Sequence, residues 1–179
     1  MHINPLLIVL VCICCSAAVT APTSSAASSP ATEPTTQPIV QADDGVILLH
    51  ARDVAVHGKT VRYEPQPNKN TIGYWTNKDD WVSWDFEVKR AGKFRVIILQ
   101  GCGKDSGGSQ VEFAVGKQTV TTTVKDTGGF QNFAARDIGT IELAEGEHTL
   151  TVKPLTKPGL AVMDLRSVTL EPVKEKEKK

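Results

Sequence analysis

The sequence predicts an all-β protein, either a β-sandwich or a barrel. Short segments rich in Val, Ile, Thr and aromatic residues recur at even spacing, and turns with glycine or charged residues separate them. No stretch has the apolar period of an amphipathic helix. The expected strands are residues 46–51, 60–63, 81–88, 93–100, 110–115, 118–124, 137–143, 148–153 and 160–170.

Residues 1–21 are predicted to be a signal peptide. The apolar run at residues 6–15 is too short to span a bilayer, and small residues follow at Ala18 and Ala21, where cleavage is expected. Export therefore predicts a secreted or cell-envelope protein. Cysteines inside the run leave lipid anchoring open as the alternative, and a membrane is expected as a partner only in that case.

A linker, a domain and a tail are expected to follow. Residues 22–42 are dominated by Ser, Thr, Pro and Ala without apolar periodicity, which is typical of a disordered linker. Residues 43–172 are predicted to form one β-sandwich domain, and residues 173–179 a solvated charged tail. The chain has 20 basic and 20 acidic residues, so no nucleic-acid partner is expected.

Cysteine usage predicts a domain without disulfides. Three of the four cysteines lie in the predicted signal peptide, and only Cys102 remains in the domain. We expect Cys102 to be an unreactive, semi-buried thiol, because no histidine pattern accompanies it. The domain is therefore expected to be held by its apolar core.

The most regular pattern is the alternation at residues 81–88. Val82, Trp84, Phe86 and Val88 share one face, which predicts a half-buried strand, and Trp81 is expected to pack at the sheet end. Two hairpins are expected, one joining 111–115 to 118–124 and one joining 138–143 to 148–152.

Two aromatic residues precede this strand and do not belong to its apolar face. Tyr74 and Trp75 are adjacent, so we expect them to point in different directions, one toward the core and one toward solvent. Phe130 follows two glycines, which allow it to project from a turn. These aromatic side chains either stack on a ligand or pack within loops, and the sequence leaves both interpretations open.

Five segments in order resemble a known family. They are D-W-V-S-W-D-F-E-V at 80–88, R-A-G-K-F-R-V at 90–96, T-G-G-F-Q-N-F at 127–133, G-T-I-E-L-A-E-G-E-H-T-L at 139–150 and V-M-D-L-R-S-V-T-L at 162–170. Together they resemble the carbohydrate-binding modules of families 6 and 35, especially the copies appended to exported bacterial sulfatases and glycoside hydrolases. The resemblance implies a jelly-roll β-sandwich of the galactose-binding-like type.

The resemblance also implies a glycan site at the loop end of the sandwich. The candidate carbohydrate-binding residues are Tyr74, Trp75, Phe130, Gln131 and Asn132, with two aromatic rings holding a sugar between them. Val162 stands where the family often carries a hydroxyl-binding Asn. No catalytic residue and no cofactor are expected.

A structural calcium ion is not expected either. His50, Ala51 and Arg52 replace the family's Glu-Ala-Glu, whose acids help to hold the ion. Asp164 alone remains as a weak candidate metal ligand, and calcium prefers six to eight oxygens.

Two functions are left open by the sequence. The first is an exported, non-catalytic carbohydrate-binding module. The alternative is a structural or protein-interaction sandwich of the cell envelope without glycan binding, favoured by Val162 and the missing acids. Enzymatic activity is not expected, since the chain lacks the C/S-x-P-x-R motif of sulfatases and no carboxylate pair stands out for glycoside hydrolysis. Lys69, Lys78 and Arg136 leave open an anionic glycan, although scattered solvated charges are the simpler interpretation.

Overall fold

The computed structural model describes residues 38–174. The predicted signal peptide, most of the predicted linker and most of the charged tail lie outside these residues. In the described part of the chain, no helix is long and apolar enough to cross a membrane. The domain boundaries at residues 43 and 172 remain predictions.

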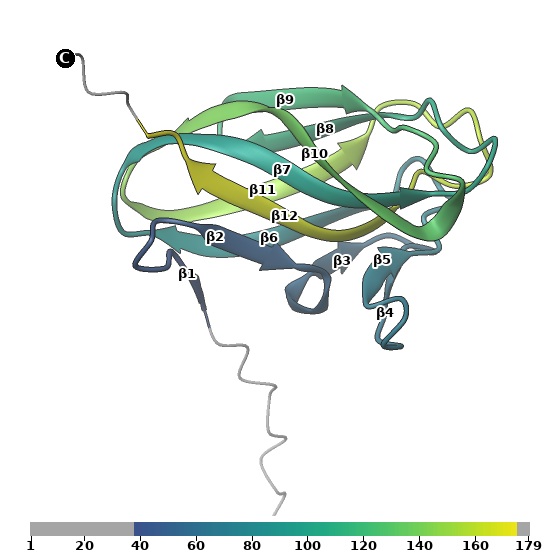
Figure 1. The fold of residues 1–179 in the computed structure, drawn as a ribbon, viewed down its shortest axis with the longest axis horizontal. Coiled ribbons are helices and arrows are strands. Elements are labelled where there is room, and N and C mark those ends of the chain that lie inside the picture. The colour runs from purple at the N-terminus through teal and green to yellow at the C-terminus, as the bar shows by residue number, and fades with distance from the viewer. Residues whose placement is uncertain (1–37, 175–179) are drawn as a thin grey trace, which may run out of the picture. The chain divides into compact units, whose positions relative to one another are not determined.

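Two six-stranded sheets pack face to face, so the prediction of an all-β sandwich is confirmed (Figure 1). One sheet has the order β1 (Ile39–Val40), β6 (Trp81–Val88), β11 (Gly146–Pro154), β8 (Gln110–Val115) and β9 (Gln118–Thr123), and β3 (Ala55–His57) also pairs with β6. The other has the order β10 (Gly129–Leu143), β7 (Gly92–Cys102), β12 (Asp164–Pro172), β5 (Thr71–Gly73) and β4 (Arg62–Glu64), and β2 (Ile47–His50) also pairs with β12. A single 3-10 turn, η1 (Ala51–Asp53), interrupts this β structure.

The core lies between the sheets and is lined by alternating strand residues. Val82, Trp84, Phe86 and Val88 on β6 are all buried, as their alternation predicts. The Trp84 indole N–H donates to the backbone oxygen of His50 at 2.8 Å, so this large core side chain also satisfies its polar atom. This packing joins β6 to β2 across the interior.

One predicted hairpin is confirmed and the other is wrong. β8 and β9 form the first hairpin, with Gly116 at a φ of +59° in its turn. The second does not form, because β10 pairs with β7 whereas β11 pairs with β6 and β8. The chain instead crosses between the sheets at residues 144–145. The apolar alternation is the same in either arrangement, so the pattern alone did not reveal the crossing.

Several strand boundaries also differ from the prediction. β3 and β5 have three residues each, too few to give a recognisable period, and neither was predicted. β10 begins at Gly129 rather than at residue 137, and β12 begins at Asp164 rather than at residue 160. Both differences fall at the same end of the sandwich, where the candidate site lies.

Candidate functional site

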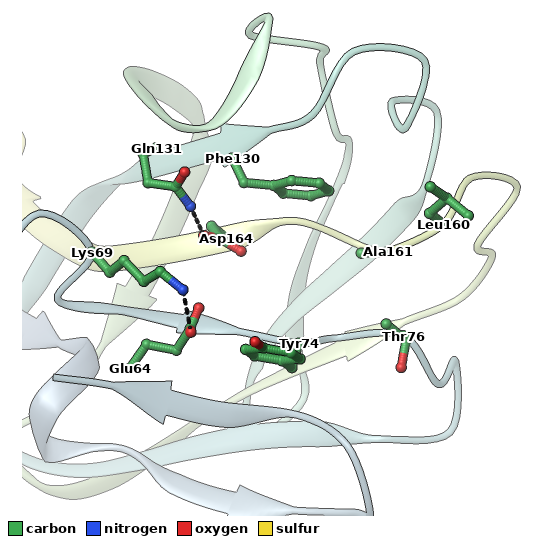
Figure 2. A pocket seen from close by; sticks show the side chains of 9 residues that line it. All are labelled: Glu64, Lys69, Tyr74, Thr76, Phe130, Gln131, Leu160, Ala161 and Asp164. Carbon is green, nitrogen blue, oxygen red and sulfur yellow. Dashed lines mark hydrogen bonds and ion pairs between the residues drawn. The ribbon is translucent and has the colours of Figure 1, made fainter. Parts of the chain in front are cut away.

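A cleft of about 260 Å³ opens where β5 ends and where β10 and β12 begin (Figure 2). Its apolar lining comes from Tyr74, Phe130, Leu160 and Ala161. Its polar lining comes from Glu64, Lys69, Thr76, Gln131 and Asp164. The Tyr74 and Phe130 side chains lie on opposite sides of the cleft, as Figure 2 shows.

Tyr74 is held in the cleft by an unusual backbone conformation and by a stacked cation. Its φ of +53° lies in the left-handed region, which is uncommon for a residue with a side chain. The Arg62 guanidinium carbon lies 3.5 Å from the centroid of the Tyr74 ring, covering one of its faces. Arg62 does not line the cleft, whereas the Lys69 ammonium, which does, lies 5.7 Å from the same centroid, so a ligand that stacks on Tyr74 would also lie near Lys69. Tyr74 is 49% exposed, which makes it accessible to a ligand.

The loop that carries Tyr74 is anchored by its neighbours. Trp75 is fully buried, and its indole N–H donates to the backbone oxygen of Asp80 at 2.9 Å. The Asp80 carboxylate in turn accepts from the backbone N–H groups of Lys59, Thr60 and Val61. Burial alone would raise the pKa of Asp80. The hydrogen bonds to its carboxylate outweigh this effect and hold the pKa well below its usual range.

Phe130 is aimed into the cleft by a bulge in β10. Gly129 pairs with Cys102, and the next paired residue of β10 is Ala134, opposite Gln100, so residues 130–133 lie outside the regular ladder. Bulges of this kind re-aim side chains and are frequent beside binding sites.

Two glycines of the β7 end make room for Phe130. A Cβ atom at Gly101 would lie 2.0 Å from the backbone oxygen of Phe130, and one at Gly103 would lie 2.5 Å from the Phe130 ring. Only residues without a side chain permit these approaches. The glycine-rich segment after β7 therefore has a definite role, which is to support one wall of the cleft.

The cleft also contains a pair of carboxyl groups that are almost buried. Glu64 accepts from the Lys69 ammonium at 2.6 Å, and Asp164 accepts from the Gln131 amide at 3.5 Å (Figure 2). Glu64 is 6% exposed and Asp164 is 4% exposed. Burial, together with the negative charge of Glu64, raises the pKa of Asp164 to about 7.

The structure places three of the five predicted site residues in the cleft. Tyr74, Phe130 and Gln131 line one cleft. Trp75 does not line the cleft. Its prediction as a carbohydrate-binding residue is wrong, because its side chain is a fully buried part of the core. Asn132 does not line the cleft either, and its amide donates to the Thr127 backbone oxygen at 3.3 Å.

The Trp81 ring contacts two neighbouring side chains. The His57 ring stacks on it with centroids 3.6 Å apart, and the Lys153 ammonium lies 4.7 Å from the centroid of its ring. It is therefore a packing residue at the sheet end, as expected from its place before the alternating residues. Cys102 is fully buried, and burial raises the pKa of its thiol to about 11, in agreement with an unreactive thiol.

The residues at the position of the family's calcium site do not fit a cation. The His50 ring accepts from the Arg52 backbone N–H, and the Arg52 guanidinium lies 3.6 Å from Asp53. Within residues 38–174, no group of three or more His, Cys, Asp or Glu side chains is arranged to hold a metal ion. That the protein needs no calcium stays a prediction.

Glu64 was missed by the sequence analysis, and Lys69 was considered there only as a possible contact for an anionic glycan, not as the partner of Glu64. They lie in and after β4, a three-residue strand, and nothing in their spacing links them to Asp164 a hundred residues later. Leu160, which is 81% exposed at the cleft wall, was placed in a strand instead of a loop.

Comparison with known proteins begins with a family match. Residues 57–175 match the sequence profile of the family described as Domain of unknown function (DUF5077). The chain belongs to the DUF5077 family. No curated protein is significantly similar to it in sequence.

Solved structures show what fold this DUF5077 domain has. A family 35 carbohydrate-binding module from Clostridium thermocellum aligns with a TM-score of 0.59 and 11% identity, over 72% of this chain and 98% of the module. The family 6 module of LamC, a marine laminarinase from Zobellia galactanivorans, gives a TM-score of 0.57 and 16% identity, over 70% and 98%. The family 35 module of Abf62 from Cellvibrio japonicus gives 0.58 and 13%, over 72% and 94%.

These comparisons confirm the predicted resemblance to families 6 and 35. The DUF5077 domain is therefore a jelly-roll β-sandwich with the fold of carbohydrate-binding modules. At these identities, the similarity establishes the fold but not the ligand.

Proposed function

We propose that this domain is a non-catalytic glycan-binding module that holds a sugar ring between Tyr74 and Phe130. The observation that carries the proposal is the placement of these two rings on opposite sides of one cleft, although they are far apart in the sequence. Sugar rings present C–H faces that pack against aromatic planes.

The size and polarity of the cleft support the same conclusion. Its volume of about 260 Å³ is near the lower end for ligand pockets, which suits a single sugar ring better than an extended chain. Apolar walls with a few polar groups are typical of ligand sites, and here Gln131, Glu64 and Asp164 supply those groups. The backbone strain at Tyr74 also fits a residue positioned for binding.

The carboxyl pair raises the question of hydrolysis. Glycosidases use two carboxyl groups that flank the scissile bond, and Glu64 and Asp164 are a pair that the sequence did not reveal. Both lie next to Gly73 on the floor of the cleft, which favours binding of one group over attack from two sides. A reducing-sugar assay with each glycan that binds tests this choice, and release of reducing ends would establish an enzyme instead.

The three cations that left an anionic glycan open are each bonded to other groups of the protein. Lys69 pairs with Glu64, Lys78 pairs with Asp79, and the Arg136 guanidinium donates to Gln100, Thr122 and Thr123. The cleft therefore offers little support for an anionic sugar. Export to the cell envelope or medium remains part of the proposal and rests on the segment before residue 38.

Glycan-array binding of the purified full chain tests the function. Tyr74→Ala and Phe130→Ala should each weaken binding by about tenfold or more, since a stacked ring contributes about 1–2 kcal/mol. Leu48→Ala is the matched control, because Leu48 is 50% exposed but lies on β2 outside the cleft. If no glycan binds the wild-type protein, the alternative of a structural or protein-interaction sandwich is favoured.

A further inference from the structure

The carboxyl groups of Glu64 and Asp164 converge on a glycine. A Cβ atom at Gly73 would lie 2.3 Å from Glu64 Oε2 and 3.2 Å from Asp164 Oδ1. Both distances are measured to one point, so the two oxygens are at most about 5.5 Å apart. Gly73 lacks a Cβ atom, so the two oxygens can approach this point.

These two oxygens lack partners. Lys69 bonds the other Glu64 oxygen, Oε1, and Gln131 bonds the other Asp164 oxygen, Oδ2. Within residues 38–174, no hydrogen bond reaches Glu64 Oε2 or Asp164 Oδ1. Both residues line the cleft, and neither of these oxygens is among the fully buried polar atoms that lack a partner within residues 38–174, so a donor on a ligand can reach them.

The surrounding charges leave the pair with a negative excess once Asp164 ionises. Lys69 is the single cation bonded to either carboxyl group, and this bond raises the pKa of Lys69. Arg166 is the other nearby cation, but its guanidinium stacks on the Phe133 ring at 3.6 Å and donates to the backbone oxygens of Asn68 and Lys69. Among the described residues, Asp164 therefore has no ion-pair partner of its own.

We propose that the cleft selects a sugar carrying a protonated amino group, whose ammonium bridges Glu64 and Asp164 while the ring lies between Tyr74 and Phe130. This inference rests on the proposed glycan-binding function. A protonated amine has three N–H donors and forms bonds of about 2.8 Å to carboxylates, so at the tetrahedral angle it joins two oxygens about 4.6 Å apart. That separation lies within the bound set at Gly73.

Other sugars satisfy the pair less well. A hydroxyl group has one proton, can donate to only one of two carboxylates, and brings no positive charge to favour the ionised form of Asp164. An anionic sugar would bring a further negative charge to a pair that already shares one cation. An amino sugar supplies both the missing donors and the missing positive charge.

The test compares three β-1,4-linked oligosaccharides of equal length: glucosamine, N-acetylglucosamine and glucose oligomers. Titration calorimetry with the full chain at pH 6.5 should give binding of the glucosamine oligomer at least about tenfold tighter than of the other two. Asp164→Asn and Glu64→Gln should remove this preference. Asp79→Asn, which removes an exposed carboxylate outside the cleft, should preserve it.

The possible results distinguish the amino-sugar inference from the proposed glycan-binding function. Equal binding of the three oligomers, or a preference that persists in Asp164→Asn, would overturn the amino-sugar inference and leave glycan binding intact. No binding of these oligomers or of any arrayed glycan would overturn both. As a further readout, Asp164 should lose a proton when the ammonium binds. The net number of protons released, measured from the dependence of the binding enthalpy on the buffer, should therefore be smaller in Asp164→Asn than in the wild-type protein, because the protonation of the amine is common to both.

Discussion

Replacing Asp164 by asparagine is expected to stabilise the domain at alkaline pH. Asp164 is 4% exposed, and burial is the main cause of its raised pKa, to about 7. Ionising this carboxyl group in the folded protein therefore costs free energy that the unfolded chain avoids. Asparagine has nearly the same shape and carries no charge, so it removes this cost.

The sign and size of the effect follow from proton linkage. Below pH 4, Asp164 is protonated in both states and imposes no cost. Between about pH 4 and pH 7 it ionises only in the unfolded chain, so the free energy of unfolding falls as the pH rises. The shift from an ordinary value of 3.8 to about 7 corresponds to about 4 kcal/mol above pH 7. Allowing for relaxation, Asp164→Asn should add about 2–4 kcal/mol at pH 8 and under 1 kcal/mol at pH 4.

Asp80 provides a control in the same domain, because its pKa is lowered and its replacement is expected to destabilise the protein. It is 1% exposed, but its carboxylate accepts from three backbone N–H groups, the Thr60 hydroxyl and the Asn77 amide. These bonds lower the pKa of Asp80, so its stabilisation is present above about pH 4 and is lost as the pH falls. Asp80→Asn turns one acceptor oxygen into a donor that faces other donors, and should cost about 2–4 kcal/mol at pH 8.

Urea denaturation of the full chain and of both variants at pH 4 and pH 8 measures these differences. Subtracting the wild-type value at each pH cancels the titrating groups that do not interact with the replaced residue. If Asp164→Asn has the same effect at both pH values, the burial and ionisation assigned to Asp164 are wrong. If it destabilises at pH 8, the Asp164 carboxylate makes a stabilising contact within the protein, and the argument for an unmet acceptor fails.

Three further outcomes are expected. Gly103→Ala should weaken glycan binding by about tenfold, because its Cβ would lie 2.5 Å from the Phe130 ring, and binding at the wild-type level would show that the ring does not contact the sugar. Cys102 should resist a thiol reagent at pH 8 and react only on unfolding, whereas rapid labelling of the native protein would contradict its burial. Thermal melts with added Ca²⁺ and with a chelator should coincide, and a higher melting temperature with Ca²⁺ would reveal a site that the sequence and the structure did not indicate.

The regular parts of the fold were predictable from the sequence because they depend on local periodicity. The alternation around Trp84 fixed which face of β6 is buried, and the Gly116 turn fixed the β8–β9 hairpin. The crossing at residues 144–145 was not predictable in this way, because residues on both inner faces of a sandwich are apolar. Choosing the sheet for each strand requires the complete set of strand pairings.

The candidate site was predictable only where a single residue stands out. Tyr74 and Phe130 are aromatic residues that the apolar alternation leaves unassigned, and both line the cleft. Trp75 is adjacent to Tyr74 but is fully buried, whereas Tyr74 has a left-handed backbone and is 49% exposed, and the sequence does not indicate which of the two rings enters the core. The carboxyl pair depends on a contact between distant strands, so no local signal for it exists.

The cleft is built from features that each reduce the stability of the fold. Tyr74 has a strained backbone, four residues of β10 leave the regular ladder, and Asp164 is buried without an ion-pair partner. Natural proteins retain such features where function requires them. All three meet at one cleft, which is what the proposed binding function predicts. The measurement on Asp164 therefore bears on function as well, because a residue that destabilises the free domain and strengthens ligand binding belongs to a binding site.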